Sequence, residues 1–157
     1  MKKKELNMQH NNDVLKVLND LIRTSEDGKK GFLAAAEKAE DSGLKSLLKD
    51  RSAACAKAID ELQALVSTMG GKPEDSGSAA GAVHRGWVKA RATVGDANLA
   101  VLEEVERGED IAKAAYADAL KCDLPPNVRS TVESQQQGVL KNHDRIRELR
   151  NQRRAAA

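Results

Sequence analysis

Hydrophobic residues recur along this chain every three or four positions, which is the period of an α-helix and not of a β-strand. Four stretches carry the pattern, and we expect helices at about residues 13–39, 42–70, 96–122 and 126–152. No run of β-branched and aromatic residues indicates a strand, so no sheet is expected. The pattern therefore predicts an all-α protein.

The predicted helix ends coincide with residues that cap or break helices. Asn11–Asp13, Asp41 and Asp96 can each accept hydrogen bonds from the free N–H groups at the start of a helix. The Gly70-Gly71 pair favours a helix end. Pro126 suits a first helical turn, where its missing N–H has no partner to lose. These signals support the four predicted ranges.

The lengths of the connections predict how the helices are joined. Two connections are short, so the first helix should lie antiparallel to the second, and the third antiparallel to the fourth. The segment 71–95 is long enough to cross the bundle and should contain a short fifth helix, in which His84-Arg85-Gly86-Trp87 could bind an anion or, as we favour, pin the crossover to the bundle through the Trp87 indole. We therefore expect residues 1–157 to form one ferritin-like four-helix bundle with one long crossover.

Four polar side chains fall at similar heights on or beside the faces that should be buried. They are Glu26, Glu106, Glu109 and His143. A buried charge is costly unless it is paired, so this group needs partners of its own or a cation. Carboxylate and imidazole groups suit iron, manganese or zinc. One hypothesis is therefore a single transition-metal site formed by these four residues.

A purely structural polar network is the alternative. Glu109 could pair with Arg51, or accept hydrogen bonds from His143 and Tyr116, and so fix the register of the helices. A di-iron centre in such a bundle takes a Glu from each of two helices and a Glu-x-x-His motif from each of the other two. Leu140 stands where the carboxylate before His143 should be, and the second predicted helix has no histidine. The sequence thus lacks the ligands of a complete di-iron centre.

Composition narrows the class of protein further. Charged residues make up 32% of the chain with a net charge of only +2, which is typical of solvated helices. No apolar stretch reaches the roughly 20 residues of a membrane span, and no aromatic residues accompany the basic chain ends, so neither membrane nor nucleic-acid binding is indicated. Cys55 and Cys122 lie far apart, and no secretory signal precedes them, so we expect a cytoplasmic protein with reduced thiols.

An ordered set of short motifs resembles a mostly proteobacterial family of ferritin-like four-helix-bundle proteins of unknown function. The motifs, in order, are Leu18-Asn19-Asp20-Leu21, Asp27-Gly28-x-x-Gly31-Phe32, Gly70-Gly71-x-Pro73-x-Asp75-x-Gly77-Ser78, His84-Arg85-Gly86-Trp87, Glu106-Arg107-Gly108-Glu109-Asp110 and Asn142-His143-Asp144-x-Ile146-x-x-Leu149-Arg150. The resemblance covers about residues 10–150. It implies the ferritin-like fold and a bacterial origin, and no established activity.

Three functions agree with these observations. The first is a bundle that holds one transition metal in its core without catalysis, with a stress-related role inferred from fold analogy. The second is a metal-dependent oxidase or peroxidase that uses Glu26, Glu106, Glu109 and His143. The third is a non-catalytic homo-oligomer that associates through alanine-rich outer faces, and a homo-oligomer is expected in any case. The missing di-iron ligands favour the first function over the second.

Overall fold

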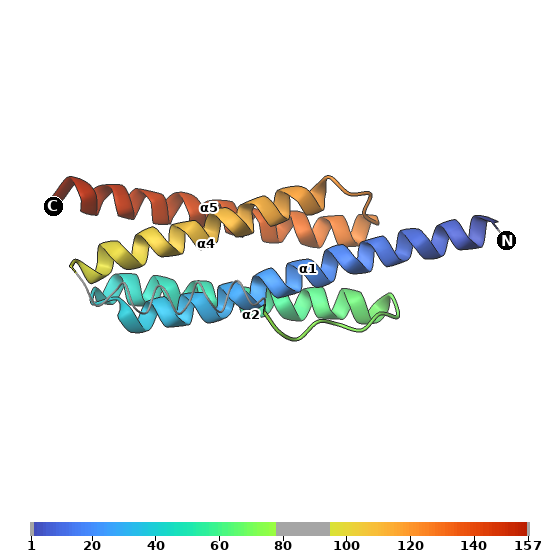
Figure 1. Cartoon of the computed structure of the whole chain (residues 1–157), viewed down its shortest axis with the longest axis horizontal. Helices are drawn as coiled ribbons and strands as arrows, with labels where there is room; N and C mark the ends of the chain where they lie inside the picture. Colours follow the sequence, from blue (N-terminus) through green and yellow to red (C-terminus); the bar gives the residue numbers. More distant parts are fainter. Residues whose placement is uncertain (1, 78–94, 157) are drawn as a thin grey trace.

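A computed structural model describes residues 2–77 and 95–156, and these residues form four α-helices without any strand (Figure 1). The helices are α1 (Lys2–Lys38), α2 (Ser42–Thr68), α4 (Ala97–Leu120) and α5 (Pro126–Ala156). None of the described helices is long and apolar enough to cross a membrane. The prediction of an all-α protein is confirmed, while the predicted crossover helix with His84, Arg85 and Trp87 lies outside the described residues.

The four helices pack as a square bundle. Both α1 and α5 contact α2 and α4, so α1 lies diagonally across from α5. Figure 1 shows α2 and α4 running in one direction, and α1 and α5 running in the other. Parallel α2 and α4 require a connection that returns along the length of the bundle. The predicted ferritin-like topology with one long crossover is therefore confirmed.

The helix ends follow the capping residues that the sequence indicates. Asp41 accepts a hydrogen bond from the backbone N of Leu44 at 2.8 Å, and Asp96 accepts from the backbone N of Asn98 at 3.0 Å. After α2 the chain turns at Gly70, whose φ of +78° is rarely adopted by a residue with a side chain. The observed ends of α2 and α4 lie within two residues of the predicted ones.

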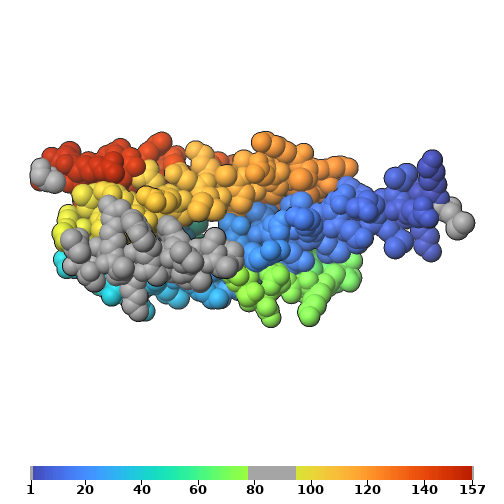
Figure 2. Space-filling model, viewed as in Figure 1, coloured from blue at the N-terminus to red at the C-terminus, as the bar shows by residue number. Residues whose placement is uncertain are grey.

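The first helix begins much earlier than predicted. α1 starts at Lys2 and not near residue 13, because Asn11–Asp13 continue the helix instead of capping it. Gln9 donates a hydrogen bond to Asp13 at 3.0 Å, one turn further along the helix. No Gly or Pro before residue 13 interrupts the helix. The first turns extend beyond the end of the bundle, as Figures 1 and 2 show.

One end of the bundle is tied together by two polar side chains. Asn98 at the start of α4 accepts hydrogen bonds from the backbone N atoms of Glu40 and Asp41, at 2.7 and 3.1 Å. Arg153 near the end of α5 lies 4.0 Å from a carboxylate oxygen of Asp41 and 3.7 Å from one of Asp96. The last turns of α5 therefore reach the caps of both α2 and α4.

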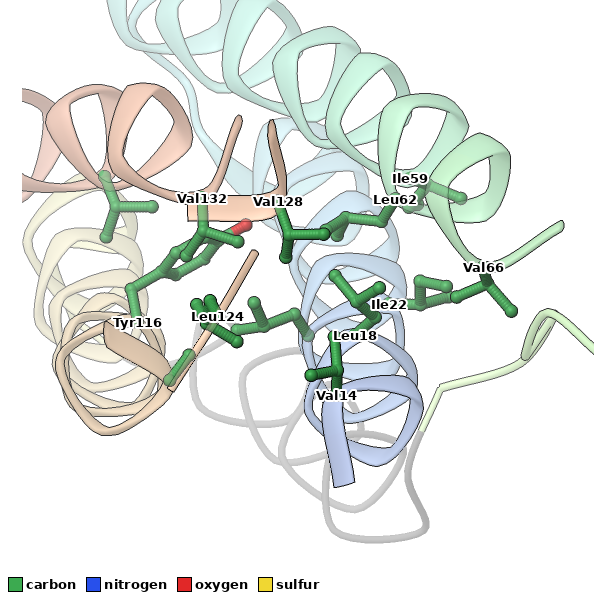
Figure 3. Packing of buried hydrophobic residues seen from close by; sticks show 13 residues of the cluster. Val14, Leu18, Ile22, Ile59, Leu62, Val66, Tyr116, Leu124, Val128 and Val132 are labelled. Atoms are coloured by element: carbon green, nitrogen blue, oxygen red, sulfur yellow. The ribbon is translucent and has the colours of Figure 1, made fainter. Parts of the chain in front are cut away.

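The apolar core has two parts separated by a polar middle. The first part includes Leu18 and Ile22 of α1, Leu62 of α2 and Val132 of α5, which point toward one another in Figure 3. The second, toward the other end, is built around residues such as Leu48. Burial of these side chains supplies the main favourable term in folding. The residues between the two parts form the candidate site.

Candidate functional site

A cavity of about 410 Å³ lies in the middle of the bundle. All four described helices contribute to its walls. The lining residues discussed below come from α1 (Ser25, Gly28, Phe32), α2 (Arg51, Cys55), α4 (Glu109, Tyr116) and α5 (Gln135, Gly138, Val139). The cavity thus lies where the periodicity of the sequence places polar residues on buried faces.

Glycines open this space. Gly28 and Gly31 of α1, Gly108 of α4 and Gly138 of α5 all line the cavity, although a glycine inside a helix is less favourable than alanine by about 1 kcal/mol. A Cβ at position 28 would lie 3.0 Å from the Cys55 Sγ atom, so α1 and α2 approach closely there. A Cβ at position 138 would lie 3.8 Å from Arg51 Nη1, which is an ordinary contact. Close packing explains Gly28, whereas Gly138 leaves room beside Arg51.

Arg51 presents a guanidinium group to the cavity without a carboxylate partner. Its Nε atom is buried and makes no hydrogen bond, and no ion pair joins Arg51 to an acidic residue within the described ranges. The Cζ atom lies 5.9 Å from the centre of the Phe32 ring, within range of a cation–π contact. The predicted direct pair with Glu109 is therefore absent from the described contacts.

Glu109 is 3% exposed and has one satisfied and one unsatisfied oxygen. Oε1 accepts a hydrogen bond from Asn142 Nδ2 at 3.0 Å, while Oε2 is buried without a partner. Burial raises the pKa of the Glu109 carboxyl group, and this effect outweighs the lowering by Arg51, Asn142 and His143. Neither His143 nor Tyr116 donates to Glu109, so the predicted network forms with different partners.

Three of the four predicted metal ligands are engaged by other charged residues. His143 Nε2 lies 2.5 Å from Asp110 Oδ1, Glu106 pairs with Arg150, and Glu26 lies 3.4 Å from Lys29 Nζ. All four predicted ligands are buried, as the helical periodicity indicates.

The donor set does not fit the di-iron centre that ferritin-like folds suggest. Across residues 2–77 and 95–156, no three His, Cys, Asp or Glu side chains lie close enough together to hold a metal ion. Among the four predicted ligands, a buried atom without a hydrogen-bond partner is found on two side chains, as Oε2 of Glu109 and Nδ1 of His143. We therefore derive no chemistry through a di-iron centre.

Tyr116 and Cys55 give the cavity uncharged polar groups. The Tyr116 hydroxyl donates to Gln135 Oε1 at 2.8 Å and lies 3.5 Å from the Ser25 hydroxyl. Burial raises the pKa of Tyr116 to about 12 and that of Cys55 to about 11. Cys55 is thus a protonated thiol at neutral pH and not a nucleophile.

Sequence reasoning missed several partners of the buried polar residues. Asn142, Asp110 and Arg150 bond to Glu109, His143 and Glu106, and all three stand inside the motifs that carry the family resemblance. Asn142 comes directly before His143, Asp110 directly after Glu109, and Arg150 at the end of the last motif. These positions could have suggested that the residues pair between α4 and α5. Nothing in the sequence indicated that Gly138 lines the cavity, apart from its position inside a predicted helix.

Fold and site together define a ferritin-like four-helix bundle with a central cavity, in which the described residues do not form a di-iron centre. A solved two-domain protein from Anabaena variabilis, with a DJ-1/ThiJ/PfpI-like and a ferritin-like domain, has a similar fold, with a TM-score of 0.75 and 12% sequence identity. The likeness covers 94% of this chain, which spans only 38% of that protein. The chain belongs to the family described as domain of unknown function DUF2383, which matches residues 13–122.

The family match and the fold confirm the coarser part of the resemblance, a ferritin-like family of unknown function. No curated protein matches the sequence. The proteobacterial origin, the cytoplasmic location and the homo-oligomer stay predictions.

Proposed function

We propose that this protein is a binding protein whose central cavity holds a small organic molecule. The observation that carries the proposal is the cavity of about 410 Å³. Sites for small molecules typically measure about 300–1,000 Å³ and combine apolar walls with a few polar groups. Here Phe32, Val105 and Val139 supply apolar wall, and Arg51 and Glu109 supply polar groups without full partners.

The cost of the cavity to stability supports this proposal. An unfilled space inside a bundle destabilises it, because the lining atoms lose contacts that larger side chains would make. Alanine in place of Gly138 would reduce the space and favour the helix by about 1 kcal/mol. A sequence shaped only for stability would fill this position, so the open space is better explained by a ligand.

The test uses a neutral fluorescent probe, N-phenyl-1-naphthylamine, whose emission rises in an apolar site. We expect saturable binding of one probe per chain. The variant Gly138→Leu should abolish it, because its side chain would project beside Arg51 into the cavity. The matched control Ser130→Leu places the same side chain at an exposed position of α5 outside the cavity and should leave binding unchanged. Absence of saturable binding, or equal loss in both variants, would contradict the proposal.

A single metal ion is the second candidate, and within the described ranges fewer than three His, Cys, Asp or Glu side chains would hold it. Glu109 Oε2 and His143 Nδ1 are both buried and both lack a hydrogen-bond partner. Elemental analysis of chelator-free protein after exposure to Fe(II), Mn(II) and Zn(II) tests it. Stoichiometric metal that is lost in Glu109→Ala and in His143→Ala, and retained in Glu133→Ala, would support this candidate over the first. Protein without metal under all three conditions would remove it, and with it the predicted oxidase or peroxidase.

A further inference from the structure

The unsatisfied groups of the cavity have opposite character. Arg51 offers N–H donors and a positive charge, and its buried Nε has no partner in the protein. Glu109 offers an acceptor, since its buried Oε2 has no partner either. A buried polar atom without a partner destabilises the folded protein, so two such atoms on residues of one cavity point to a missing third participant.

The two groups lie near each other without direct contact. Both side chains line the same cavity, and the positive charge of Arg51 lowers the pKa of the Glu109 carboxyl group against the larger effect of burial, yet no ion pair joins them within the described ranges. Each group has one other contact: the guanidinium of Arg51 lies over the Phe32 ring, and Asn142 donates a hydrogen bond to Oε1 of Glu109. Because both residues line one cavity, the space between them is taken as part of that cavity.

The chemistry of this gap determines the kind of head group that fits. A carboxylate matches a guanidinium, which can donate two parallel hydrogen bonds to it. An ammonium group can donate a hydrogen bond to Oε2 of Glu109 and provide the positively charged partner that this carboxylate oxygen does not have in the protein. A molecule that carries both groups a few ångströms apart would satisfy Arg51 and Glu109 together. A purely anionic ligand would satisfy Arg51 alone and be repelled by an ionised Glu109.

The walls around this gap determine the rest of the ligand. Phe32, Ala35, Val105, Ala112 and Val139 give a surface that favours an apolar body. We infer that the ligand is a small zwitterion with an apolar body, such as a hydrophobic amino acid, whose carboxylate binds Arg51 and whose ammonium group binds Glu109. This inference rests on the proposed function, because it names the ligand class of the same cavity.

The test compares three probes that share one apolar body. L-Phenylalanine carries both charged groups, 3-phenylpropionate lacks the ammonium group, and phenethylamine lacks the carboxylate. Each is used to displace N-phenyl-1-naphthylamine from the wild-type protein. We expect phenylalanine to bind about tenfold or more tightly than either of the other two, since each charge-assisted hydrogen bond contributes to affinity.

Two variants assign the two ends of the ligand. Arg51→Met should weaken phenylalanine and 3-phenylpropionate about tenfold or more, and leave phenethylamine unchanged. Glu109→Gln should weaken phenylalanine and phenethylamine, and leave 3-phenylpropionate unchanged or tighter. Circular dichroism establishes that each variant is folded, and the comparison of probes on the wild-type protein stands without the variants.

The outcomes separate this inference from the proposed function. If the neutral probe binds in the cavity but phenylalanine competes no better than its two relatives, the zwitterion is wrong and the binding protein stands. If the anion alone competes best, the ligand is anionic and the role of Glu109 is wrong. If the neutral probe does not bind at all, both the proposed function and this inference fail.

Discussion

Glu109 shows how a single residue can oppose the stability of the fold around it. The side chain is 3% exposed, one of its oxygens has no partner, and burial raises its pKa. In the folded protein the neutral form is therefore favoured relative to the unfolded chain. The group stabilises the fold most at acid pH, and this contribution is lost as the pH rises through the raised pKa.

Glu109→Gln should consequently gain stability relative to the wild type as the pH rises from 4 to 7, by about 1 kcal/mol for each unit by which the pKa is raised, because the amide keeps an oxygen for Asn142 and cannot ionise. Urea unfolding at both pH values measures it. Glu133→Gln, at an exposed site of α5, is the control and should change little. A difference between the two proteins that stays constant from pH 4 to pH 7 would contradict the raised pKa of Glu109.

Tyr116 gives a second pH dependence, at the alkaline end. Its pKa is about 12 in the folded protein against 10.0 for the free group, so folding favours the protonated phenol. The stabilisation is fully present below pH 10 and is lost as the pH rises toward 12. Tyr116→Phe should lose about 1 kcal/mol at pH 7, since the hydrogen bond to Gln135 disappears. Denaturant titrations at pH 7 and pH 11 should show a smaller difference at the higher pH, and a constant difference would contradict the assignment.

At the scale of the helices, two glycines of the cavity should respond differently to the same change. Gly138→Ala should raise the free energy of unfolding by about 1 kcal/mol, because its new Cβ meets Arg51 only at ordinary contact distance. Gly28→Ala should gain less, since its Cβ would lie 3.0 Å from Cys55 Sγ. The difference should vanish when both substitutions are made in a Cys55→Ala background. Equal gains in the wild-type background would show that α1 and α2 can separate at this point.

The helices themselves were the part that the sequence predicted best. Caps such as Asp41 and Asp96 act within one turn, so their effect can be read from neighbouring residues. The predicted helix start at Asn11–Asp13 was wrong, because a residue that is able to cap a helix does so only if the chain before it is not helical. The burial of Glu109 and His143 followed from periodicity, whereas their partners Asn142 and Asp110 depend on how α4 and α5 rotate against each other. Periodicity within one helix carries no information on that rotation.

At the scale of the whole molecule, the first turns of α1 are separate from the packed bundle. Residues 2–10 are exposed, including Leu6 at 65% and Met8 at 59%, and they extend beyond the neighbouring helices (Figure 2). Deleting them should change the free energy of unfolding by less than about 0.5 kcal/mol, since few contacts are lost. Urea unfolding of the shortened chain measures this. A large loss would show that these turns contact a second copy, and light scattering would then show a fall in mass.

The contacts of Asn98 and Arg153 have a consequence for the order of assembly. The α1–α2 and α4–α5 pairs are each joined by a short connection, so each can form early from neighbouring parts of the chain. Asn98 and Arg153 instead join residues of one pair to residues of the other. Their contacts cannot form until the two pairs dock and the long connection between α2 and α4 closes. The contacts of Asn98 and Arg153 should thus be the last to form during folding. Their loss should chiefly speed unfolding, while each helical pair forms as before.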